Sequence, residues 1–79
     1  MFVVRGKDWI SGTQDYEKGM PGEGMIYWCN DTKWASVTWD GGSYGEYRIG
    51  AENSFDLYHA GNKTSIKAYC LFSTFYFIF

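Results

Sequence analysis

The stretch KWASVTWDGGSYGEYRI, residues 33–49, decides the fold. Its first seven residues place Ala35, Val37 and Trp39 on one side and the intervening side chains on the other. This period of two is typical of a half-buried strand. The segment DGGS (40–43) follows, and its glycines can adopt the positive φ of a tight turn. The rest of the stretch returns as a second strand, so the sequence predicts a β-hairpin here.

Three more β-branched or aromatic runs predict strands, at residues 2–5, 25–29 and 55–59. The glycine-punctuated segment 16–24 is interpreted as a loop. On the returning strand of the hairpin, Tyr47 and Ile49 are expected on opposite faces. Five short strands with large inward aromatic side chains predict an all-β fold, a small five-stranded barrel whose closure removes exposed edges.

The composition limits the size of the core and the class of partner. The chain has 79 residues, enough for one small domain, and 22% of them are aromatic. A domain of this size buries only about 60% of its unfolded surface, so its stability depends on a few large side chains. The net charge is −2, with Lys and Arg scattered singly, and nucleic-acid binding normally needs a basic surface. We expect no nucleic-acid partner.

The metal-ligating residues are few and far apart. Cys29, Cys70 and the single histidine, His59, cannot form a four-ligand zinc site, so we expect no metal or cofactor in this chain. No signal peptide is evident at the start of the sequence. We therefore expect a cytoplasmic location and two free, mostly buried thiols.

The end of the chain differs in composition from the rest. We place the domain at residues 1–60 and interpret 61–79 as an apolar C-terminal extension outside the barrel. Only twelve residues follow Lys67, fewer than the roughly 20 that a membrane-spanning helix needs. A truncated membrane segment, a sixth strand and an incidental extension of a fragment all stay open. The last is favoured, and a membrane partner is not expected.

One ordered set of residues extends over most of the chain. It comprises Val3-Val4-Arg5-Gly6, Asp8-Trp9, Gly12, Gln14-Asp15, Val37, Trp39-Asp40, Gly42-Ser43, Tyr47-Arg48, Gly50 and Asp56-Leu57. In order and spacing this set closely resembles the MIB/HERC domain of the Mind bomb and HERC ubiquitin-protein ligases. The resemblance covers about residues 2–58 and implies a barrel like that of Src-homology-3 domains.

The resemblance also implies a function. It indicates a non-catalytic module that recognises protein or peptide substrates of a ubiquitin-protein ligase, while a RING or HECT region absent here transfers ubiquitin. In Mind bomb proteins such domains help to bind the cytoplasmic tails of Notch ligands, so a role in Notch signalling is expected. Zinc would be bound only by neighbouring domains of a parent ligase.

This chain departs from the family pattern at three places. Gly45 stands where the family usually has Asn ahead of the Tyr-Arg pair, and Asn53 stands where a glycine is common. The loop after Gln14-Asp15 is longer and less rich in glycine. The loop length and Gly45 bear on partner specificity rather than on the fold.

The candidate partner-binding residues come from the same motif: Trp9, Gln14, Asp15, Trp39, Asp40, Tyr47, Arg48 and Asp56. For Trp9, Gln14, Asp15, Asp40 and Arg48 we favour a structural interpretation. Trp9 would cover an open barrel end, because a tiny domain needs its tryptophans in the core. Gln14 and Asp15 would hydrogen-bond the backbone of their own loop. Arg48 would form an internal ion pair with Asp15 or Asp56, and Asp40 is most simply a turn residue.

Two other binding modes stay open beside this function, whereas an enzymatic role is not expected. Catalysis is not expected, because His59 is the only base that could serve a cysteine nucleophile. An aromatic cage for a methylated lysine would use two or three of Trp28, Trp34, Tyr44 and Tyr58. A receptor for peptide tails would instead bind an extended peptide through main-chain pairing.

Overall fold

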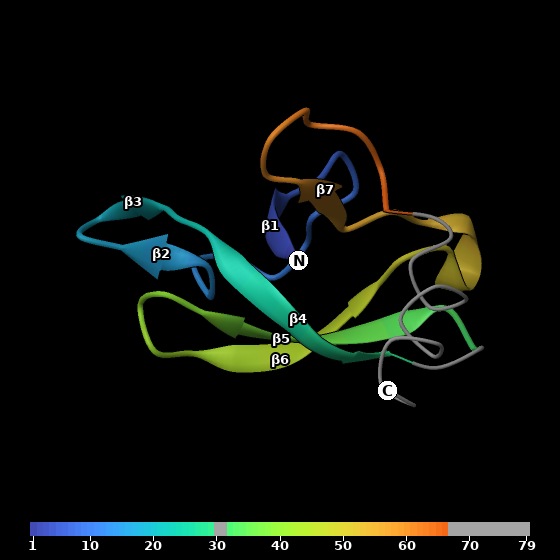
Figure 1. Ribbon diagram of the computed structural model, residues 1–79, viewed down its shortest axis with the longest axis horizontal. Coiled ribbons are helices and arrows are strands. Elements are labelled where there is room, and N and C mark those ends of the chain that lie inside the picture. Colours follow the sequence, from blue (N-terminus) through green and yellow to red (C-terminus); the bar gives the residue numbers. More distant parts are fainter. Residues whose placement is uncertain (30–31, 67–79) are drawn as a thin grey trace.

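The computed structural model describes residues 1–29 and 32–66 (Figure 1). Its strands are β1 (Phe2–Arg5), β2 (Tyr16–Glu17), β3 (Met20–Pro21), β4 (Gly24–Cys29), β5 (Trp34–Trp39), β6 (Tyr44–Arg48) and β7 (Leu57–His59). A single 3₁₀ turn, η1 (Ala51–Asn53), is the only helical element in this part of the chain. The all-β prediction is confirmed.

The main sheet has five antiparallel strands in the order β6-β5-β4-β1-β7. Each of these strands coincides, within one or two residues, with a strand expected from the sequence. The predicted hairpin is the β5–β6 pair, in which the amide of Trp39 donates to the carbonyl of Ser43 (2.8 Å) and Gly42 has a φ of 107°.

The barrel does not close by continuous strand pairing. Its two edge strands, β6 and β7, meet through one isolated bridge between Ile49 and Phe55 and a 2.8 Å bond from the Asp56 amide to the Arg48 carbonyl. The fold is therefore a small, open β-barrel. The predicted closure is reduced to this short seam because the two strands meet only where the chain passes from one to the other.

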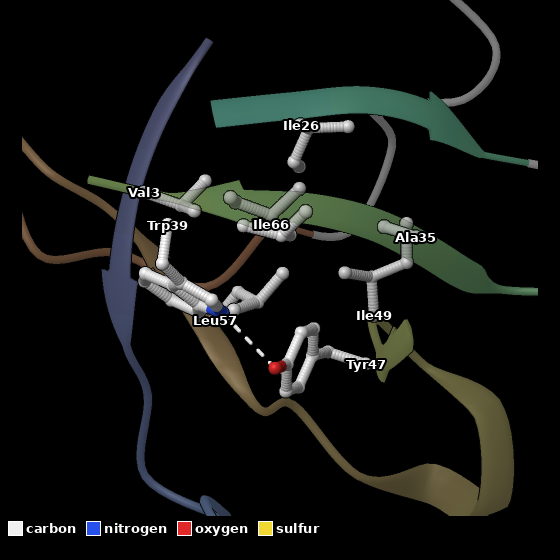
Figure 2. Packing of buried hydrophobic residues seen from close by; sticks show 9 residues of the cluster. Val3, Ile26, Ala35, Trp39, Tyr47, Ile49, Leu57 and Ile66 are labelled. Carbon is white, nitrogen blue, oxygen red and sulfur yellow. Dashed lines mark hydrogen bonds between the residues drawn. The ribbon is translucent and has the colours of Figure 1, made fainter. Parts of the chain in front are cut away.

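The core lies inside the curved sheet (Figure 2). Its buried members are Val3, Ile26, Ala35, Val37, Trp39, Tyr47, Ile49, Leu57 and Ile66. Tyr47 and Ile49 both belong to it, so their predicted separation onto opposite faces is wrong. Residues two apart on a strand share a face, and the regular period continues to the end of the hairpin.

The predicted loop 16–24 contains a two-stranded ribbon, β2–β3, that the sequence analysis missed. Its turn residues, Lys18 and Gly19, have φ values of 55° and 83°. Positive φ at both central positions is the signature of a two-residue hairpin turn. The turn was not predicted because Lys18 stands at its first central position, and residues other than glycine rarely adopt a positive φ.

Gly24 allows β4 to pass close to the aromatic core. A Cβ atom at this position would lie 2.6 Å from Cε3 of Trp39 and 2.7 Å from Cγ1 of Val37. We expect Gly24→Ala to lower the free energy of unfolding by about 1–3 kcal/mol, because buried side chains must shift. Urea unfolding checks this. Gly61→Ala is the control, since a Cβ there meets nothing within 4 Å, and an equal loss in both variants would contradict the packing explanation.

The chain folds back onto the barrel after β7. Ser65 bridges Tyr58, and Ile66 is 1% exposed within the core, although both lie in the segment 61–79 that was expected outside the barrel. Residues 67–79 of that segment lie outside the described residues, so the expectation for them stays a prediction. Cys29 is not a free thiol, which corrects the expectation for this cysteine; Cys70 lies outside the described residues.

Candidate functional site

Three aromatic rings form the centre of the motif. Trp9 stacks on Tyr47, with centroids 5.1 Å apart, and meets Trp39 edge to face at 5.5 Å. The indole nitrogen of Trp39 donates to the hydroxyl of Tyr47 (3.0 Å), which in turn donates to Oε1 of Gln14 (2.5 Å). Trp9 is partly buried against the core and so packs as a cover over it, as expected. Burial raises the pKa of Tyr47, which keeps its hydroxyl as a donor.

The first ion pair joins β1 to the loop that carries Trp9. Arg5 donates through Nε and Nη2 to the two carboxylate oxygens of Asp15, at 2.7 and 2.6 Å. The Asp15 side chain is fully buried, and the hydrogen bond to it raises the pKa of Arg5. The guanidinium also lies over the ring of Trp9, 5.2 Å from its centroid. The prediction that Gln14 and Asp15 bond the backbone of their own loop is therefore wrong, since both side chains reach across to other elements.

The second ion pair closes the barrel seam. Arg48 donates through Nε and Nη2 to Asp56 (2.9 and 2.7 Å), and its backbone amide donates to the same carboxylate (2.8 Å). Nη2 also donates to the carbonyl of Asp8 at 3.0 Å. The predicted internal ion pair of Arg48 is confirmed, and its partner is Asp56. Hydrogen bonding to this carboxylate raises the pKa of Arg48.

Asp8 and Arg5 were not predicted as site residues, although both belong to the motif. Oδ2 of Asp8 accepts bonds from the amide of Phe55 (2.7 Å) and from Nζ of Lys7 (3.0 Å). The bond from Phe55, followed by that from Lys7, lowers the pKa of Asp8. The sequence did contain a signal for this role of Asp8. It follows Gly6 at the start of a loop, where a carboxylate can accept hydrogen bonds from backbone amides.

The lowered pKa of Asp8 predicts a pH effect on stability. Because the folded state holds this carboxylate ionised more strongly than the unfolded state, its contribution is complete above the usual value of 3.8. The contribution falls as the pH drops from there through the folded pKa. We expect Asp8→Asn to lose stability at neutral pH and to show a shallower acid dependence below pH 3.8. Urea unfolding between about pH 2 and 7 measures this. If the free energy of unfolding falls equally steeply in acid for Asp8→Asn and for the unsubstituted protein, the prediction is contradicted.

Seven of the eight predicted site residues thus support the scaffold. Trp9, Trp39, Tyr47 and Gln14 form one connected group, and Asp15, Arg48 and Asp56 belong to the two ion pairs. Asp40 is separate: it is exposed in the β5–β6 turn, and its amide donates to the carbonyl of Glu23 (2.9 Å).

The surface instead presents a mostly apolar row that sequence reasoning missed. Phe2 pairs with Met25, Met25 with Thr38, and Thr38 with Tyr44, so these four residues run across β1, β4, β5 and β6 on the outer face of the sheet. Phe2 is 55%, Met25 44% and Tyr44 74% exposed. We call Phe2, Met25, Thr38 and Tyr44 the outer row. The signal was present in the alternation of each strand, but the strand register that aligns the row cannot be read from one sequence.

No two of the four proposed cage aromatics are in ring contact among the described residues. Trp28 lies opposite Ser36 and Trp34 opposite Arg48, whereas Tyr58 lies opposite Val4 at the β7 end of the sheet. Tyr44 belongs to the outer row. Among the described residues the ring pairs in contact are those of the Trp9, Trp39 and Tyr47 group. No observation in this structure favours the aromatic cage.

The described residues offer neither a metal-binding cluster nor a membrane-spanning helix. Within residues 1–29 and 32–66 no three His, Cys, Asp or Glu side chains are grouped closely enough to hold a metal ion. The same part of the chain contains no helix that is long and apolar enough to cross a bilayer.

These features define a small, open β-barrel domain held by two Arg–carboxylate pairs, each with a buried carboxylate, and by an aromatic cluster. The family model described as Mib_herc2 matches residues 1–61, and the chain belongs to this MIB/HERC2 domain family. The resemblance found in the sequence motif is thereby confirmed.

The relatives that the chain matches are large ubiquitin ligases and a related protein. It is 44% identical over 55 residues to the E3 ubiquitin-protein ligase hecd-1 of Caenorhabditis elegans, and 41% identical over 56 residues to human E3 ubiquitin-protein ligase HERC2. Human putative HERC2-like protein 3 is also 41% identical over 56 residues. Each match covers 70% of this chain but only 2%, 1% and 5%, respectively, of these relatives. The chain thus corresponds to one small domain of such proteins.

Proposed function

We propose that this domain recognises protein partners for a ubiquitin-protein ligase and takes no part in ubiquitin transfer. The observation that carries the proposal is the outer row, in which Phe2, Met25 and Tyr44 are exposed on one face of the sheet and only Thr38 is polar. Apolar side chains grouped on the surface of a small domain are typical of interaction sites. Two of the relatives, hecd-1 and HERC2, are E3 ubiquitin-protein ligases, which supports a role for this domain in protein ubiquitination.

The partner we propose is a peptide tail of a target protein, as in Mind bomb-like binding of Notch-ligand tails. An extended peptide can lie across the outer row and contact Phe2, Met25 and Tyr44 without moving the scaffold. A binding site on the outer row is consistent with the burial of motif residues, because a side chain such as Asp15 is not accessible to a partner from solvent. A cytoplasmic location is part of the same proposal.

A titration followed by NMR tests this function. The 79-residue chain is titrated with an unmodified cytoplasmic tail peptide of a Notch ligand and with a methylated-lysine peptide. We expect the unmodified peptide to bind and to shift the amides of the outer row. Tyr44→Ser should weaken binding, whereas Tyr27→Ser should not, because Tyr27 is similarly exposed (49%) but lies in a β-bulge outside the row. Binding that requires methylation would contradict the proposal.

The absence of transfer activity is tested separately. We expect the chain to leave a ubiquitin-charged conjugating enzyme intact. Among its described residues the one possible cysteine nucleophile, Cys29, is not a free thiol. Discharge of ubiquitin that exceeds a buffer control would show that the domain contributes to the chemistry.

A further inference from the structure

One edge of the sheet offers unpaired backbone groups. In the β5–β6 hairpin the amide of Trp39 donates to the carbonyl of Ser43. Because hydrogen-bonded and non-hydrogen-bonded pairs alternate along an antiparallel ladder, Tyr44, Glu46 and Arg48 direct their amides and carbonyls away from β5. These three residues form the outer edge of the sheet, since β6 is its terminal strand.

The barrel seam uses only the last of these three residues. The amide of Arg48 donates to the Asp56 carboxylate, and its carbonyl accepts from the Asp56 amide, each at 2.8 Å. Within the described part of the chain, the outward amides and carbonyls of Tyr44 and Glu46 have no such bonds. An unpaired edge of this kind is a template for another strand.

The charge around this edge is negative. Four described carboxylates take part in no ion pair: Glu17, Glu23, Asp40 and Glu46. Glu46 lies on the edge strand. Glu17 belongs to β2, and the amide of Asp40 in the β5–β6 turn donates to the carbonyl of Glu23 (2.9 Å), so these three lie where the ribbon meets the turn. Figure 1 shows the β2–β3 ribbon beside this turn. This contact is direct, since a Cβ on Gly41 would lie 2.2 Å from the carbonyl oxygen of Tyr16. Two described arginines lie nearby, Arg5 over the ring of Tyr16 and Arg48 on β6, but each is already paired with a buried carboxylate. Lys18 in the ribbon turn is the one described cation there without an ion pair, so the edge attracts positive charge.

We propose that the open edge of β6 accepts a basic, extended segment of a target protein as an additional strand. The inference rests on the proposed function and adds to the outer row a second contact, the adjacent edge of β6, with a stated partner chemistry. An antiparallel segment would exchange backbone hydrogen bonds with Tyr44 and with Glu46. Its length is limited, because the seam at Arg48 blocks pairing beyond Glu46.

The side chains of the edge define the sequence of the segment. The residue opposite Tyr44 would extend the outer row by one position, which favours an apolar side chain. The residue opposite Glu46, two positions earlier in the segment, would be Lys or Arg, because opposite charges stabilise cross-strand pairs. The residue between them faces Gly45, where a Cβ would already lie 2.8 Å from the Tyr47 hydroxyl. The segment therefore begins with a basic residue, continues with any residue that fits beside Gly45, and ends with an apolar residue.

A set of synthetic peptides tests the pairing. The probe is acetyl-TTKTITT-amide, added to the 79-residue chain and followed by NMR amide shifts. We expect the largest shifts at Tyr44 and Glu46. N-methylation of the Lys or the Ile of the probe removes a donor that faces β6 and should weaken binding at least about fivefold. N-methylation of the Thr between them alters a donor that faces away, and it should leave the affinity within about twofold.

Charge exchange supplies the matched control on the protein. Glu46→Lys should weaken binding of the Lys-containing probe and strengthen binding of a probe in which Glu replaces that Lys. Glu17→Lys makes the same change of net charge off the edge strand, and its effect should be smaller. Shifts centred away from β6, insensitivity to N-methylation, or no binding of the probe would each overturn the edge assignment. The proposed function would still stand in these cases if the Notch-ligand tail binds and shifts the outer row.

Discussion

Arg48→Met is expected to lower the free energy of unfolding by about 3–5 kcal/mol. The substitution leaves the Asp56 carboxylate, whose side chain is 5% exposed, without its bidentate partner. It also removes the donor to the Asp8 carbonyl and so releases the seam on both sides. A domain of this size has a total stability on the order of 5–10 kcal/mol, so the variant should be close to unfolding. Urea unfolding at low temperature measures the loss.

The control for this prediction is Glu52→Gln. Glu52 also pairs with Arg48, but at 3.5 Å and with a side chain 68% exposed. An exposed pair contributes little, and we expect a change of no more than about 0.5 kcal/mol. If Arg48→Met is tolerated as well as Glu52→Gln, the seam does not depend on the buried pair.

Trp39→Ala is expected to cost about 3–5 kcal/mol of unfolding free energy. Trp39 is 1% exposed, contacts Trp9 and Tyr47 edge to face, and donates to the Tyr47 hydroxyl. The truncation leaves a cavity beneath Trp9 and removes the donor that fixes the Tyr47 hydroxyl. The Trp9 loop should loosen together with the core, which amide hydrogen exchange of residues 8–14 would report.

Trp28→Ala is the matched truncation on the outer face. Trp28 is 49% exposed and lies opposite Ser36. Because half of its surface is already in water, the loss should be no more than about 1.5 kcal/mol. Equal losses for the two tryptophans would mean that burial in the aromatic cluster does not decide the cost.

The sequence predicted the main sheet well, because the alternation in residues 33–39 and the DGGS turn are strong local signals. The ribbon β2–β3 was missed, since Lys18 occupies a position where glycine is the usual signal. Closure of the barrel was overstated because strand counts do not show how far two edge strands run together. The contribution of Ile66 to the core was hidden by the apolar tail that follows it.

The candidate site was predicted as a set of residues but not as a set of contacts. The internal pairing of Arg48 followed from its residue type, whereas the choice of Asp56 depended on the seam. Arg5 and Asp15 lie ten positions apart, and nothing local shows that the intervening loop brings them together. The outer row depends on register across four strands. A single sequence contains no direct record of that register.

The central claim is that the motif residues hold the fold and that recognition occurs on other surfaces. The most direct test compares the urea unfolding free energies of Asp15→Asn and Asp40→Asn, the same chemical change at a buried and at an exposed motif aspartate. We predict a loss of about 1–3 kcal/mol for Asp15→Asn, because the single amide oxygen of Asn cannot accept both hydrogen bonds from Arg5 in this fully buried position. Asp40→Asn should change stability by no more than about 0.5 kcal/mol. Similar values for the two variants, or an unchanged stability of Asp15→Asn, would contradict the claim.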